Sequence, residues 1–97
     1  MWYVYVVECS DNSLYCGITT DTIRRLHEHN TTKKGAKYTR SRRPVRLVFQ
    51  SYPTSRSRAA SIEAKFKKLT VIQKRKLISD NCIFNSYFTN NDPTGAR

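Results

Sequence analysis

Cysteine, proline and glycine are scarce in this chain of 97 residues, with three residues of each type. Cys9, Cys16 and Cys82 are odd in number and lack a C-x-x-C spacing, so we expect neither a disulfide framework nor a zinc site. No apolar run reaches the ~18 residues of a membrane span, and the first residues lack the basic segment of a signal peptide. We therefore predict an intracellular protein, in the cytoplasm or nucleus, that is not secreted and not inserted in a membrane.

Acidic residues are few as well, because 7 Asp and Glu stand against 18 Lys and Arg, for a net charge of +11. A basic domain of this size most often binds a polyanion, and nucleic acid is the usual one. An anionic membrane is a weaker interpretation, since no long basic amphipathic helix with bulky apolar residues is present. Between Glu28 and Asp80 the single carboxylate is Glu63, and an isolated acid within such a basic segment indicates a specific role.

Two segments rich in Val and Tyr, residues 2–9 and 14–19, predict a β-hairpin. A three-residue turn at residues 10–12 places the even-numbered side chains on one face, which is nearly all apolar and should be core. That face comprises Trp2, Val4, Val6, Leu14, Cys16 and Ile18. The same register puts Tyr5 and Tyr15 together on the other face, along with Tyr3, Val7, Gly17 and Thr19.

The first predicted helix begins after Asp21, a good N-cap, and runs to about Asn30. Arg25 and His29 are four residues apart and share one face of it. A second stripe of the helix is formed by Ile23, Leu26 and Asn30. Residues 33–44 predict a basic loop, and residues 45–52 predict a third strand.

A second helix is predicted from a cap at Thr54 or Ser55 to about Leu69. Glu63 lies at the border of its apolar stripe, which consists of Ala59, Ile62, Phe66 and Leu69. Thr70 and Gln73 form a capping box for a third helix to about Ser79. The order β-β-α-β-α-α predicts an α+β domain, with a small, mainly antiparallel three-stranded sheet flanked by helices. We assign residues 1–88 to this domain, with a short extended segment at 81–88, and residues 89–97 to a flexible tail.

Six short segments, in this order and spacing, resemble those of the GIY-YIG nucleases. They are YVY at 3–5, YCG at 15–17, RRLHEHN at 24–30, GAKYTR at 35–40, RRPVRLV at 42–48 and SIEAKFKKL at 61–69. The resemblance covers residues 2 to about 78 and is nearest to the small single-domain bacterial and viral members, with Slx-like features. It implies the GIY-YIG fold and a DNA endonuclease that uses a divalent metal, with a structure-specific role in repair or recombination.

By position, the resemblance implies a catalytic set of Tyr5, Tyr15, Arg25, His29 and Glu63. It also implies that Glu63 holds one ion, Mg²⁺ or Mn²⁺. Tyr3 and Val4 replace the glycine and isoleucine of the first motif, and Cys16 replaces the isoleucine of the second. The family often has an asparagine after the metal ligand, and both Asn81 and Asn85 remain candidates for it.

These residue types suit phosphodiester hydrolysis, which needs a base for water and positive charge on the phosphate. The Arg25 guanidinium can grip phosphate oxygens. Either Tyr5 or Tyr15 can be the base if nearby cations lower its pKa, and His29 can move a proton or orient a tyrosine. The ordinary interpretation of Glu63 is a surface ion pair with Lys67, worth only ~0.3–0.5 kcal/mol.

The basic loop predicts contacts with the DNA backbone and, through its tyrosine, stacking on a base. Its proposed binding residues are Lys33, Lys34, Lys37, Tyr38, Arg40, Arg42 and Arg43. Net charge supports equally an alternative function, that of a basic nucleic-acid-binding module or accessory subunit without cleavage of its own. A partner protein or a homodimer would then supply specificity.

Overall fold

The computed structural model describes residues 1–80, and it confirms the predicted α+β class and the order of the predicted elements. The predicted segment at 81–88, the tail, Asn81, Cys82 and Asn85 lie outside the described residues, so the boundary at residue 88 stays a prediction. The elements are β1 (Tyr3–Glu8), β2 (Leu14–Thr19), α1 (Thr22–Thr31), α2 (Lys37–Arg40), β3 (Arg46–Gln50), α3 (Arg56–Lys67) and α4 (Val71–Ile78).

The hairpin has the predicted register. Val4 lies opposite Ile18 and Tyr5 lies opposite Gly17 in an antiparallel pair. The turn closes through the Asn12 N–H, which donates to the Cys9 carbonyl, and Asn12 adopts a left-handed φ of 68°. A three-residue hairpin loop commonly ends in such a residue, and asparagine tolerates it better than most side chains.

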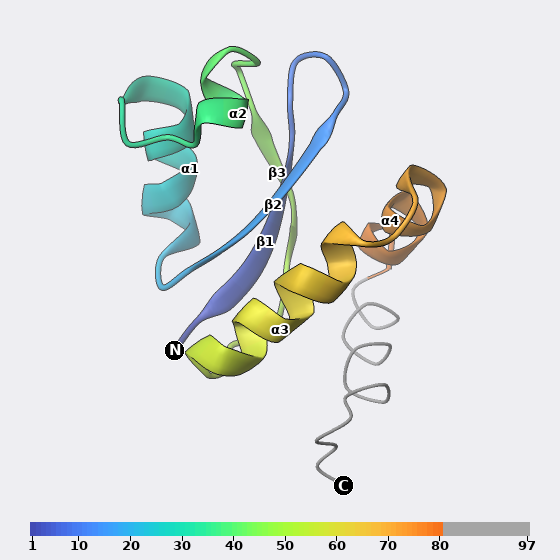
Figure 1. The fold of residues 1–97 in the computed structure, drawn as a ribbon. Coiled ribbons are helices and arrows are strands. Elements are labelled where there is room, and N and C mark those ends of the chain that lie inside the picture. Colours follow the sequence, from blue (N-terminus) through green and yellow to red (C-terminus); the bar gives the residue numbers. More distant parts are fainter. Residues whose placement is uncertain (81–97) are drawn as a thin grey trace, which may run out of the picture.

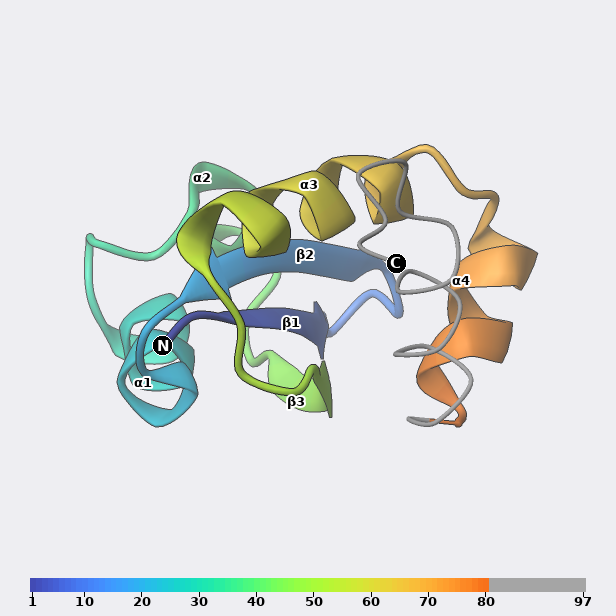
Figure 2. The same ribbon diagram turned by 90° about the horizontal axis from the view of Figure 1, so that it is seen from below.

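Helices cover both faces of the sheet, whose strand order is β2-β1-β3 (Figure 1). The even-numbered face packs against α3 and α4 and forms the main core, as predicted, with Val4, Val6, Cys16, Phe49, Ala59, Phe66 and Leu77 buried. The odd-numbered face is buried too, because α1 lies against it and Leu26 packs on a second cluster of Tyr5, Val7, Cys9 and Val45. Figure 2 shows α3 lying along β2 and β1. Tyr5 is therefore buried under α1, and Tyr15 is partly buried beside it.

A β-bulge in β3 distributes its side chains between the two cores. Val6 lies opposite Phe49, whereas Val7 lies opposite Leu47, so Val48 is the extra residue. Without it, Leu47 and Phe49 would face the same side of the sheet. With it, Phe49 joins the cluster under α3 and Leu47 joins the cluster under α1.

The predicted helix starts are confirmed. The Asp21 carboxylate accepts from the Arg24 N–H, Ser55 caps α3, and the capping box of Thr70 and Gln73 opens α4. The prediction of a loop throughout residues 33–44 is wrong, since that segment contains the helix α2. Ile23 does not pack on the apolar stripe that we drew through it, because 82% of it is exposed.

Candidate active site

Tyr5 and Tyr15 lie on the same face of neighbouring strands, as the predicted register requires. Val7 is directly opposite Tyr15, so the two tyrosines are diagonal neighbours. The ring of Tyr5 extends over Gly17, and a Cβ atom at Gly17 would lie 2.6 Å from the Tyr5 Oη. The glycine of the second motif thus has a physical purpose here, which is to leave room for the tyrosine of the first.

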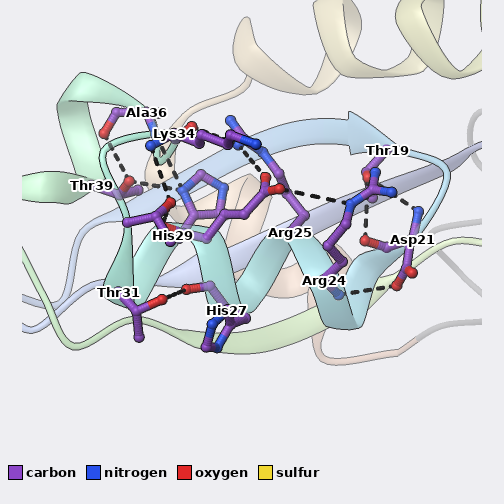
Figure 3. Close-up of polar contacts among 12 residues, drawn as sticks. Thr19, Asp21, Arg24, Arg25, His27, His29, Thr31, Lys34, Ala36 and Thr39 are labelled. Carbon is purple, nitrogen blue, oxygen red and sulfur yellow. Dashed lines mark hydrogen bonds and ion pairs between the residues drawn. The ribbon is translucent and has the colours of Figure 1, made fainter.

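His29 is fully buried and reaches from α1 to Tyr5. Its Nε2 lies 2.7 Å from the Tyr5 Oη, and its ring meets the Tyr15 ring edge-on at 5.4 Å between centroids. The spacing of Arg25 and His29 on one helix face brings the guanidinium close to the Tyr5 hydroxyl, where its positive charge acts to lower the pKa of that tyrosine. Arg25 also donates to the Glu28 carboxylate at 2.9 Å and to the Lys34 carbonyl at 2.7 Å (Figure 3).

Burial dominates the electrostatics of this cluster. It raises the pKa of Tyr5 to about 12, although the Arg25 guanidinium opposes the shift. It lowers the pKa of His29 to about 4, and the positive charge of Arg25 adds to that effect. Both side chains are therefore neutral at pH 7 in the free protein. Arg24, by contrast, lies on the outer side of α1 and makes only a 3.8 Å ion pair with Glu28.

Glu63 lies in the layer on the opposite side of the sheet from α1. It lies on α3, which covers the even-numbered face, and its carboxylate is 3.1 Å from the Lys67 Nζ. The same Nζ lies 5.9 Å from the centroid of the Tyr15 ring. Burial raises the pKa of the Cys16 thiol to about 12, and the Glu63 carboxylate adds to the increase, which places that carboxylate beside the edge strand β2. Lys67 thus links Glu63 to the tyrosine cluster, and the metal role of Glu63 stays a prediction.

Comparison with known proteins agrees with this geometry. A model of the GIY-YIG catalytic domain matches residues 1–76 of the chain. The chain belongs to the GIY-YIG family. Its nuclease class follows from that family, whereas the catalytic roles of the two tyrosines, Arg25 and His29 stay a prediction.

Relatives within the GIY-YIG family extend the match. The chain is 51% identical over 77 residues to a UPF0213 protein of Desulfotalea psychrophila. The aligned region covers 79% of this chain and 70% of that protein. A UPF0213 protein of Haloquadratum walsbyi is 51% identical over 84 residues, or 86% of this chain and 92% of that one. The solution NMR structure of a UPF0213 protein from Bacillus halodurans has a TM-score of 0.52 and 45% identity, and covers 81% and 84% of the two chains.

The basic loop of this GIY-YIG domain divides into two groups of residues. Arg42 donates to Asp11 at 3.0 Å and covers the Tyr38 ring at 3.9 Å, so it fastens the hairpin turn to α2. Arg43 donates to the carbonyls of His29 and Thr32 at the end of α1. The other cations are exposed, and no hydrogen bond or ion pair of their side chains is found within residues 1–80. They are Lys33, Lys34, Lys37 and Arg40. Tyr38, 39% exposed, stacks beside Tyr15 at 6.0 Å.

Sequence reasoning missed Thr39 and the purpose of Gly17. Thr39 is fully buried, and its Oγ1 lies 2.8 Å from the His29 Nδ1. Thr39 lies in a segment that we predicted to be a basic loop, and its sequence neighbours show no apolar pattern that would indicate burial. Its place inside GAKYTR, one of the six matched segments, is the signal that was available.

Within residues 1–80, none of the helices has the length and the apolar character that a membrane span requires.

The buried, neutral His29 predicts a loss of stability on mild acidification. An unfolded histidine has a pKa near 6.5 and the folded one about 4, so between these values the unfolded chain binds more protons. Its stabilising contribution is complete above pH 6.5 and is lost as the pH falls toward 4. From pH 6.5 to 5 we expect the free energy of unfolding to fall by about 2 kcal/mol.

Urea unfolding at each pH measures this loss, and His29→Gln is the matched variant in which the slope should flatten. The carboxylates that form ion pairs, such as Glu8 and Glu28, have a lowered pKa and titrate below this window. An equal slope in wild-type protein and in His29→Gln would show that His29 is not buried in neutral form.

Proposed function

We propose that this protein is an endonuclease that hydrolyses phosphodiester bonds in DNA with one divalent cation, Mg²⁺ or Mn²⁺. We further propose branched or flapped DNA in repair or recombination as its substrate. The observation that carries the proposal is the buried contact between Tyr5 and His29 beside Arg25. Phosphate binding alone does not require a neutral, fully buried histidine that is hydrogen-bonded to a tyrosine.

Arg25 is the group that meets the scissile phosphate. About a quarter of its side chain is exposed, and its fork is already oriented by Glu28 and the Lys34 carbonyl. A guanidinium held in this way loses little conformational freedom when a phosphate binds, and it offsets charge that develops on the phosphate oxygens. Glu28 is thus a residue that orients Arg25.

Tyr5 and His29 work as a proton relay, and a preformed tyrosinate is not needed. The raised pKa of Tyr5 and the lowered pKa of His29 both make full transfer of the Tyr5 proton unfavourable in the free protein. A concerted transfer avoids that state. Water gives a proton to the Tyr5 Oη while Tyr5 gives its own to the His29 Nε2, and the water oxygen bonds to phosphorus. The P–O bond to the leaving oxygen breaks, and that oxygen departs with the bonding electrons and takes a proton from solvent. A phosphate anion at Arg25 also raises the pKa of His29, because it offsets the charge that lowers it.

The residues present fit a divalent cation at Glu63. Within residues 1–80 no group of three or more His, Cys, Asp and Glu gathers, so one carboxylate is the protein ligand that this part of the chain supplies. Mg²⁺ suits such a site, because it keeps several waters and binds one or two carboxylates together with substrate phosphates. When bound, the cation supplies charge neutralisation at the phosphate and lowers the pKa of a coordinated water. The carboxylate already contacts a cation, the Lys67 ammonium, and this group would have to move aside for a metal ion to bind there.

The direct test is a cleavage assay on single-stranded, duplex, flap and junction DNA with Mg²⁺, Mn²⁺ or EDTA. We expect cuts that need the metal and that are strongest on a branched or flapped substrate. Binding to these DNAs without cleavage of any of them would favour the alternative, a binding module or accessory subunit. If DNA is cleaved only after a second protein is added, that partner supplies the specificity. If the cleavage rate per protein molecule rises with the concentration of this protein, a homodimer supplies it.

DNA binding is expected to be salt-sensitive through the exposed cations of the loop. Removal of one cation that binds a phosphate should reduce the slope of log affinity against log salt by ~0.9 on duplex DNA. We therefore expect the double variant Lys33→Gln/Lys37→Gln to flatten the slope by about 1 to 2. Arg42 and Arg43 are kept, since their substitution also breaks hydrogen bonds that hold the fold.

The matched control is Lys68→Gln/Lys76→Gln, which removes the same charge from exposed lysines at the end of α3 and on α4. Titration of a fluorescent duplex at several salt concentrations gives both slopes. A larger change in the control than in the loop variant would move the binding surface to the helices.

A further inference from the structure

A chain of short hydrogen bonds continues from the Tyr5–His29 pair into the protein. The His29 Nδ1 lies 2.8 Å from the Thr39 Oγ1, and the Thr39 hydroxyl donates to the Ala36 carbonyl at 2.9 Å. All three side chains are buried, with exposed fractions of 2% for Tyr5 and 0% for His29 and Thr39. Figure 3 shows Thr39 and Ala36 beside the imidazole, on the segment that follows α1.

The direction of each bond follows from what the end groups can do. Arg25 only donates, so the Tyr5 proton needs an acceptor, and His29 Nε2 is the one that lies within reach in residues 1–80. Nε2 is then without a proton, and a neutral imidazole carries its proton on Nδ1. The Thr39 oxygen accepts that proton's hydrogen bond, because its own proton goes to the Ala36 carbonyl. The Ala36 N–H also points at Nδ1 as a donor, which favours the other tautomer, but at 3.4 Å it is the longest of these contacts and the weakest.

We infer that Thr39 is a positioning residue that keeps the His29 proton on Nδ1, so that Nε2 is free to take the proton of Tyr5. The inference rests on the proposed nuclease function for its kinetic consequence, whereas the position of the proton is a property of the free protein. Without the hydroxyl, the Nδ1–H loses its acceptor. The other tautomer is then favoured, in which Nδ1 accepts the Ala36 N–H and Nε2–H faces Tyr5 and cannot take its proton.

The surrounding segment holds Thr39 in place. A Cβ atom at Gly35 would lie 2.9 Å from the Glu28 carbonyl oxygen and 3.0 Å from the His29 Cα, so the chain closes directly on the backbone of α1. The Thr39 N–H also donates to the Ala36 carbonyl, at 3.0 Å. The hydroxyl is thus fixed by its own helix turn, and its oxygen is presented to the imidazole with little freedom to move.

The test compares Thr39→Val, which keeps the shape and removes the hydroxyl, with Thr39→Ser, which restores it. Ring ¹⁵N chemical shifts of the labelled full chain at pH 7 report the tautomer, and His27→Gln assigns the second histidine. We expect Nδ1–H in wild-type protein and in Thr39→Ser, and Nε2–H in Thr39→Val. Single-turnover cleavage of the best DNA substrate should fall ~10²-fold or more in Thr39→Val, the scale of proton-transfer catalysis. It should recover to within a few-fold of wild type in Thr39→Ser.

The failures of the two hypotheses are distinguishable. A wild-type spectrum with the proton on Nε2 would overturn the role of Thr39, and it can be recorded even if the valine variant does not fold. An equal loss of rate in Thr39→Ser and Thr39→Val, with normal melting of both, would also overturn it. A wild-type protein with the expected tautomer that cuts no DNA would leave the positioning of His29 intact and overturn the proposed function.

Discussion

Glu63→Gln is expected to abolish cleavage while DNA binding stays equal or becomes tighter. The carboxylate is the proposed metal ligand, and an amide of nearly the same shape is a far poorer ligand for a hard cation. One negative charge fewer on a protein of net charge +11 also favours docking of a polyanion. The rate should fall to the level of wild-type protein in EDTA, which is the largest effect that we predict.

The fold should survive this change. The side chain makes an ion pair with Lys67 on a partly exposed face of α3, and such a pair contributes only ~0.3–0.5 kcal/mol. Lys67→Gln is the matched control, because it removes the same pair and leaves the carboxylate. Melting curves, cleavage rates and DNA affinities of both variants separate the roles. If Glu63→Gln melts normally and cuts DNA with Mg²⁺ or Mn²⁺ at the wild-type rate, Glu63 is not the ligand.

Removal of the Tyr5 hydroxyl is expected to have the second largest effect. In Tyr5→Phe, water has no group through which to pass its proton to His29, so the rate should fall by ~10²–10⁴. The His29 Nε2 also loses its partner in a buried site, which should lower stability by ~1–3 kcal/mol. Single-turnover rates measured well below the melting temperature keep the two consequences apart.

Tyr15→Phe is the matched comparison, and it decides between the two tyrosines. The contacts that Tyr15 makes with His29, Tyr38 and Lys67 are made by its ring, so the phenylalanine variant keeps them. We expect a smaller loss of rate and little change in melting. A Tyr5→Phe protein that cuts at the wild-type rate, next to an inactive Tyr15→Phe protein, would assign the base to Tyr15.

The sequence by itself determined the strands, the hairpin register and the starts of α1, α3 and α4, because short-range effects control all of these. Alternation of apolar residues fixes which side chains share a face, and a cap needs only a side chain and an N–H three residues later. The same locality placed Tyr5 beside Tyr15, and Arg25 on the helix face of His29. The six matched segments then indicated the family, which the comparison confirmed.

Only the tertiary structure decided what each side chain meets across the sheet. Arg42, which we predict to contact DNA, binds Asp11, and this residue is 31 positions away in the sequence and comes close only after folding. The purpose of Gly17 and the burial of Thr39 depend likewise on the packing of α1 and α2 against the sheet. Glu63 lies in the layer opposite α1, and it is connected to Tyr15 through Lys67, which forms an ion pair with Glu63 and lies 5.9 Å from the Tyr15 ring. No pattern of period two or period 3.6 contains that information, since long-range contacts arise from how the layers stack and not from the neighbours of a residue in the chain.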